Sequence, residues 1–145
     1  MSIKENQANL AEILREWQHI ESKTVLHAAQ IMDRTRHPVI RLIMEIIQGD
    51  SGMHYRVQQL LLDALEKEAI TLTVEDLAGI WDAVEAHVAA ERRTGDLIVA
   101  AQRSLAGTND VVQQYLLSYL GQDERKHDRM LEELSLIKRG MFKSP

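Results

Sequence analysis

Proline is almost absent from this chain, and that most limits how it can fold. Only Pro38 and Pro145 occur among 145 residues. Proline breaks helices because it lacks the backbone N–H and clashes with the preceding turn, so long stretches of this chain are free to be helical. Apolar residues repeat there at steps of three and four, as in Leu10, Ile13, Leu14 and Trp17. This period indicates amphipathic helices and an all-α fold.

Four long helices are predicted from this pattern and from its interruptions. They span about 6–35, 38–68, 74–105 and 110–138. Pro38 suits a first helical turn, Thr73 with Asp76 resembles a capping box, and Gly107 is a plausible helix end. Long helices with short connections pack as antiparallel neighbours. We therefore expect one domain, residues 1–145, folded as an antiparallel four-helix bundle.

Composition excludes several classes of function. The net charge is −5 and no basic block stands out, so nucleic acid is not an expected partner. No apolar run approaches 18 residues, which excludes a membrane span, and the polar first ten residues lack a signal-peptide core. Without cysteine there is no disulfide, no thiolate nucleophile and no cysteine-bound metal. A cytoplasmic protein is expected.

The two halves of the chain resemble each other. Segment 50–56, "DSGMHYR", matches segment 123–129, "DERKHDR", at an offset of 73, and Glu21 matches Glu91 at an offset of 70. Five acidic or histidine side chains lie 16 to 20 residues from the nearest predicted turn, and so at one level of the bundle: Glu21, His54, Glu91, Glu124 and His127. Burying such groups unpaired is costly, so a shared cation is the expected partner.

Glu124 and His127 form a Glu-x-x-His motif, whose side chains project from one helical face and can chelate one metal. With this placement the chain resembles the ferritin-like di-iron carboxylate superfamily, in particular its small rubrerythrin-like members, without a rubredoxin domain. The resemblance implies Glu21 and Glu91 as the single glutamates, and His54 as the histidine of the other motif. It implies iron as the metal, with manganese or zinc as alternatives. It also implies that two aspartates orient the ligand histidines: Asp50 and Asp123.

Two departures from the family pattern leave alternatives open. Ser51 stands where the family has a bridging glutamate, so Asp50 or His87 would have to substitute as a ligand. The glycines on either side, Gly49 and Gly52, are expected where another helix, a water or a substrate comes close. The connection after the second helix has only about five residues, too few for the usual long crossover. The chain then forms a plain up-down bundle, or it exchanges hairpins with another subunit in a homodimer or higher homo-oligomer.

Three functions remain in view. The first is a metal-dependent redox protein that reacts with dioxygen or peroxide and takes electrons from a partner the sequence does not identify. The second is a hemerythrin-like oxygen binder, because "HVAAE", His87 to Glu91, resembles the His-x-x-x-Glu of that family, although its other histidine motifs are missing. The third is a non-enzymatic dimeric helical module with a decayed metal site. Each candidate ligand is also compatible with a solvated surface position.

Overall fold

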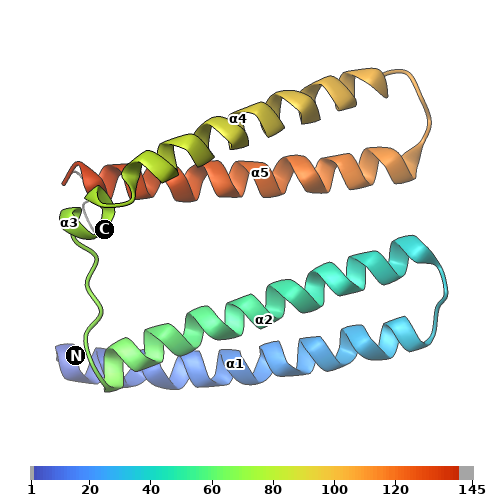
Figure 1. Ribbon diagram of the computed structural model, residues 1–145. Coiled ribbons are helices and arrows are strands. Elements are labelled where there is room, and N and C mark those ends of the chain that lie inside the picture. Colours follow the sequence, from blue (N-terminus) through green and yellow to red (C-terminus); the bar gives the residue numbers. More distant parts are fainter. Residues whose placement is uncertain (1, 141–145) are drawn as a thin grey trace. The chain divides into compact units, whose positions relative to one another are not determined.

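The computed structural model describes residues 2–140, and every regular element in that range is a helix. The helices are α1 (Ile3–Asp33), α2 (Pro38–Glu66), α3 (Val74–Ala78), α4 (Trp81–Ser104) and α5 (Val111–Lys138) (Figure 1). They belong to two compact units, unit 1 (Met1–Ile70) and unit 2 (Thr71–Pro145). The all-α prediction is confirmed for the described residues. The assembly of both units into one four-helix domain stays a prediction.

The helix predictions hold with one correction. The segment 74–105, predicted as one helix, is two helices, because α3 ends before Gly79, which is still helical in φ and ψ, and the chain leaves helical geometry at Ile80. Glycine loses more conformational freedom in a helix than other residues do, and Ile80 takes up φ −120° and ψ 2°. The capping box of Thr73 and Asp76 is present and begins α3. The fourth predicted helix corresponds to α5. Its N-cap is Asp110, whose side chain accepts a hydrogen bond from the Gln113 backbone N–H.

Unit 1 is a helical hairpin in which α1 packs along α2. Its apolar core is small and consists of Ala11, Leu14 and Leu62, with Leu65 packed against them. Farther along, the interface becomes polar. Buried there are Gln18, Glu21, Ser51 and Gln58.

Two side-chain-to-backbone hydrogen bonds fix the register of unit 1. The Gln18 amide donates to the Tyr55 carbonyl at 3.3 Å, and the Gln48 amide donates to the Val25 carbonyl at 3.0 Å. Glu21 lies between the α1 partners of these bonds, and Ser51 lies between the α2 partners. The register therefore places Glu21 and Ser51 at the same level, both in the helix interface.

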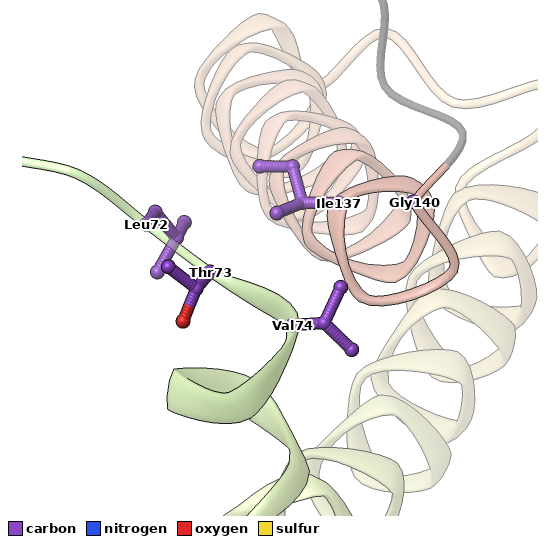
Figure 2. Close-up of a pocket in the computed structure, with 5 residues that line it drawn as sticks. All are labelled: Leu72, Thr73, Val74, Ile137 and Gly140. Carbon is purple, nitrogen blue, oxygen red and sulfur yellow. The ribbon is translucent and has the colours of Figure 1, made fainter.

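Unit 2 is a second hairpin, formed by α4 and α5, with α3 packed against α5. Leu77 of α3 is its one buried hydrophobic side chain among the described residues. Figure 2 shows Leu72 and Val74 beside Ile137 at the C-terminal end of α5, where they line a cavity of about 450 Å³. Gly121 is buried against α4, and a Cβ there would lie 3.5 Å from Ile98 Cγ2. An added Cβ at this position would therefore make ordinary van der Waals contacts.

Large apolar side chains remain exposed on both hairpins. On α1 they include Ile13, Trp17 and Ile20, and on α5 they include Leu120 and Met130. None of the described helices combines the length and apolar character required to cross a membrane. The exposed apolar faces are therefore surfaces that a further helix pair can cover.

Candidate metal centre

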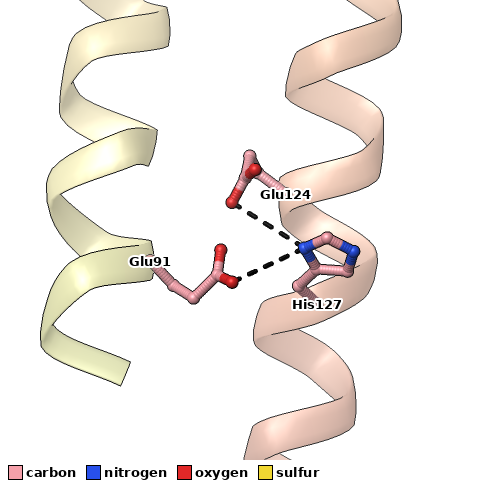
Figure 3. Close-up of side chains that lie close together, drawn as sticks. All are labelled: Glu91, Glu124 and His127. Carbon is pink, nitrogen blue, oxygen red and sulfur yellow. Dashed lines mark ion pairs between the residues drawn. The ribbon is translucent and has the colours of Figure 1, made fainter. Parts of the chain in front are cut away.

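Three of the predicted ligands meet in unit 2. Glu91 extends from α4, and Glu124 and His127 extend from α5 toward it (Figure 3). One ligand atom from each residue lies within 4.8 Å of the other two. His127 Nδ1 is 3.6 Å from Glu91 Oε1 and 4.0 Å from Glu124 Oε2. The Glu-x-x-His spacing produces this arrangement, because residues three apart on a helix are neighbours on its surface.

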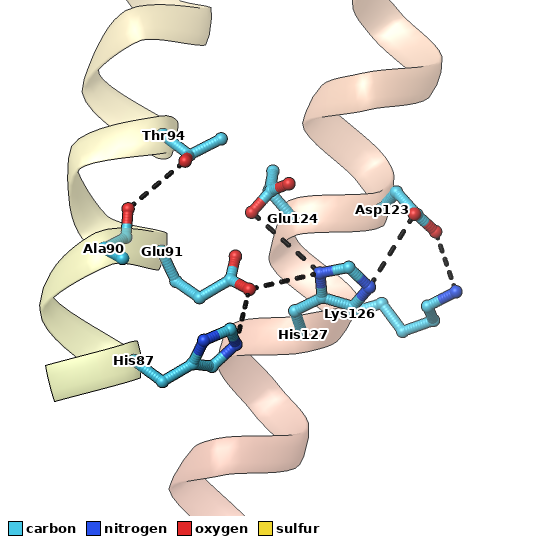
Figure 4. A network of polar contacts seen from close by, with 8 residues as sticks. All are labelled: His87, Ala90, Glu91, Thr94, Asp123, Glu124, Lys126 and His127. Carbon is cyan, nitrogen blue, oxygen red and sulfur yellow. Dashed lines mark hydrogen bonds and ion pairs between the residues drawn. The ribbon is translucent and has the colours of Figure 1, made fainter. Parts of the chain in front are cut away.

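Polar neighbours surround this cluster on both helices (Figure 4). His87 Nε2 lies 2.9 Å from Glu91 Oε1, one helical turn away on α4. Asp123 Oδ2 lies 3.7 Å from His127 Nε2, and the other Asp123 oxygen pairs with Lys126 Nζ at 2.7 Å. Since Nε2 of His127 faces Asp123, its Nδ1 faces the two glutamates. This is the orientation in which an aspartate positions a histidine whose other nitrogen binds a metal.

The two glutamates of the cluster influence each other's charge. A hydrogen bond between their carboxyl groups lowers the pKa of Glu91 and raises the pKa of Glu124. Burial and the negative charge of Glu91 raise the pKa of Glu124 further, whereas His127 opposes that rise. As the pH falls, Glu124 therefore takes up a proton before Glu91 does.

The donor set fits a divalent transition metal. Two carboxylates and one imidazole are ligands that iron, manganese and zinc accept. Glu124 Oε2 is buried and has no hydrogen-bond partner among the described residues, which is costly for an oxygen of this kind. An ion bound by the three side chains would satisfy that oxygen and would neutralise both carboxylates.

The other two predicted ligands meet in unit 1. His54 Nδ1 lies 3.2 Å from Glu21 Oε1. The Glu21 side chain is 8% exposed, whereas that of His54 is 59% exposed. Asp50, predicted to orient His54 or to replace a ligand, is exposed, and the contact that the structure shows for His54 is that of Nδ1 with Glu21. Ser51 is buried at the level of Glu21 and brings no carboxylate.

The polar interior of unit 1 contains residues that the sequence analysis did not identify. Gln18 and Gln58 are buried, and Gln58 Oε1 has no hydrogen-bond partner within the described part of the chain. Both interrupt apolar stripes one turn from a predicted ligand, Gln18 before Glu21 and Gln58 after His54. A glutamine at an apolar position of the stripe was the sequence signal from which this polar interior could have been predicted.

Comparisons with family models, with curated proteins and with solved structures found no match. In the structure, the five predicted ligands form two groups, three residues in unit 2 and two in unit 1. What the chain does has to be inferred from these groups.

Proposed function

We propose that this chain binds a transition-metal ion, iron by preference, through Glu91, Glu124 and His127, and that it is a redox protein acting on dioxygen or peroxide. The observation that carries the proposal is the convergence of these three ligand atoms, from two helices, within 4.8 Å. The buried, unpartnered Oε2 of Glu124 supports it, because a cation supplies the partner that this oxygen lacks among the described residues.

Each side chain has a distinct role in this proposal. Bound iron would supply the electrons that reduce dioxygen or peroxide. Glu91 and Glu124 would hold the ion and balance its charge. Asp123, whose Oδ2 lies 3.7 Å from His127 Nε2, would hold the imidazole with Nδ1 turned toward the ion as the ligand atom.

The proposal includes a ferritin-like arrangement in which the two hairpins form an antiparallel four-helix bundle, within one chain or by exchange between two chains of a homodimer. Exposed apolar side chains on both units support it. In unit 1, Val57 and Leu61 follow His54 at helical steps on α2, and each is about half exposed. In unit 2, Leu120 and Met130 flank His127 in the same way. Packing these faces together would remove them from water.

A second function is favoured by one observation in unit 1. Glu21 is already paired with His54, and Ser51 leaves the facing position without a carboxylate. This is what a non-enzymatic dimeric module with a decayed metal site would show. Such a protein would fold without metal, and its melting temperature would not respond to Fe²⁺, Mn²⁺ or Zn²⁺.

Metal binding by the full chain tests the proposal. Metal-free protein is incubated anaerobically with Fe²⁺, passed through a desalting column, and analysed for metal per chain and for oxygen consumption. We expect bound iron in the wild type and its loss in Glu124→Ala and His127→Ala. Glu132→Ala, an exposed glutamate on the same helix, is the matched control and should retain the metal. Metal content near zero, or unchanged in both ligand variants, would contradict the proposal.

A further inference from the structure

His87 lies beside the cluster in unit 2, outside the three residues whose ligand atoms are within 4.8 Å of one another. Its Nε2 is 2.9 Å from Glu91 Oε1, and the same oxygen is 3.6 Å from His127 Nδ1. Two ligand atoms that each bind one ion at about 2.0–2.2 Å, with a right angle at the ion, lie about 3 Å apart. The contact between His87 Nε2 and Glu91 Oε1 has about this separation. The His87 side chain is 60% exposed and therefore has room to turn toward Glu124 and His127.

Unit 1 lacks two of these four side chains at the matching positions. The offset of 70 that relates Glu21 to Glu91 places Trp17 at the position of His87, and the offset of 73 places Ser51 at the position of Glu124. What remains is one carboxylate and one imidazole, Glu21 and His54. They already contact each other at 3.2 Å, so neither lacks a partner.

We infer that unit 2 alone holds a single metal ion, with His87 as the fourth ligand beside Glu91, Glu124 and His127, and that unit 1 contributes no ligand. This inference rests on the proposed function, since it specifies the composition of the same site. Two carboxylates and two imidazoles neutralise a divalent cation and complete a four-coordinate set from two helices. His87 Nε2 and Glu91 Oε1 would then both bind the ion in place of their direct contact.

Titration of the metal-free full-length protein with Zn²⁺ and Co²⁺ tests this inference. We expect one ion per chain. His87→Ala should weaken Zn²⁺ binding at least about tenfold and change the visible spectrum of bound Co²⁺, which reports the ligands directly. His54→Ala and Glu21→Gln should change the affinity by less than about twofold and should leave the spectrum unchanged, because a ligand that is absent from the site cannot affect it. His19→Ala is the control for removing an exposed histidine, and circular dichroism verifies helix content in each variant.

The outcomes separate this inference from the proposed function. Two ions per chain, or weakened binding in the unit 1 variants, would show a site shared by both units and overturn the inference while metal binding stands. An unchanged Co²⁺ spectrum and affinity in His87→Ala would remove His87 from the ligand set. Absence of binding, or binding that ignores Glu124→Ala, would overturn the proposed function and this inference together.

Discussion

Each hairpin has one predicted glutamate ligand on its first long helix, but the partners of that glutamate differ between the hairpins. In unit 1, the buried Glu21 contacts His54 at 3.2 Å and has Ser51 at its own level in the interface. In unit 2, Glu91 meets a second carboxylate, Glu124, whose pKa is raised by that contact. A single glutamate beside a histidine is satisfied by that neighbour, whereas two facing glutamates require a proton or a cation. The matching positions Ser51 and Glu124 account for the second carboxylate, and Trp17 and His87 are a further difference between the hairpins.

The two hairpins also differ in how many apolar side chains their helices bury. The interface of α1 and α2 closes over an apolar cluster that includes Leu14 and Leu62. Helix α4 has no buried residue, and the buried residue of α5 is Gly121. Burial of apolar surface is the main stabilising contribution to such a hairpin. Among the described residues, unit 1 therefore has more of this stabilising contribution than unit 2 has.

The largest expected effect comes from giving unit 1 the carboxylate it lacks. Ser51→Glu places a second negative charge at a position that is 5% exposed, at the level of Glu21. Without metal, we expect the free energy of unfolding to fall by about 2–4 kcal/mol, because a buried charge without a partner is strongly destabilising. With Zn²⁺ or Fe²⁺, we expect much of that loss to be recovered, because the introduced carboxylate, Glu21 and His54 then repeat the ligand pattern of unit 2.

Urea unfolding with EDTA and with Zn²⁺ measures both parts of this prediction. Ser51→Gln is the matched control, since it adds a side chain of similar size without the charge. If Ser51→Glu were destabilised equally with and without metal, the difference between the hairpins would not lie in this residue alone.

A smaller effect is expected at the two glycines beside Ser51. An added Cβ at Gly49 or Gly52 would meet nothing within 4 Å in the described structure. Since glycine inside a helix costs about 0.5–1 kcal/mol relative to alanine, Gly49→Ala and Gly52→Ala should each raise the free energy of unfolding by that amount. Thermal and urea unfolding provide the measurement. Gly121→Ala is the comparison in unit 2, where the new methyl group would make ordinary van der Waals contacts with Ile98 and Gln102 and at least the same gain is expected.

The opposite result at these glycines would be informative. Loss of stability in Gly49→Ala or Gly52→Ala, with helix content retained, would mean that another helix packs closely against this part of α2. The sequence predicted such an approach, and within unit 1 the space beside both glycines is open.

Much of the fold was predictable because the signals that begin and end a helix are local. The apolar period, the sole interior proline at Pro38 and the Thr73–Asp76 capping box located most helix boundaries. The break at Gly79 was missed because the apolar period runs through it, and a glycine within a helical pattern is tolerated often enough to be overlooked. Capping and period are local properties, whereas the break depends on how Leu77 is buried in unit 2.

The candidate site was predictable only as far as helical spacing reaches. The Glu124–His127 motif fixed one side of the cluster, and the repeat pointed to Glu91. Spacing does not convey which of several neighbours a side chain contacts. His54 contacts Glu21, His87 contacts Glu91, and Asp50 is exposed whereas Asp123 approaches His127. Such contacts depend on how the two helices of each hairpin pack against each other, which the spacing within one helix does not give.

The smallest expected effect is a change in pH dependence in the metal-free protein. The pKa of Glu124 is raised above 4.5 in the folded state. Between pH 4.5 and that raised pKa, the folded chain keeps a proton on Glu124 that the unfolded chain has lost. The stability this provides is present below about pH 4.5 and is lost as the pH rises through the pKa of the folded state. Glu91 behaves oppositely, since its lowered pKa contributes stability that is lost only as the pH falls below 4.5.

Glu124→Gln isolates the first of these contributions, because it removes the titrating group and keeps the shape of the side chain. We therefore expect the wild type in EDTA to lose stability between pH 4.5 and neutrality relative to Glu124→Gln, as measured by urea unfolding at a series of pH values. A difference that is flat with pH would mean that the two carboxylates of unit 2 do not share a proton. The contrast with the Glu21–His54 pair of unit 1 would then rest on metal binding alone.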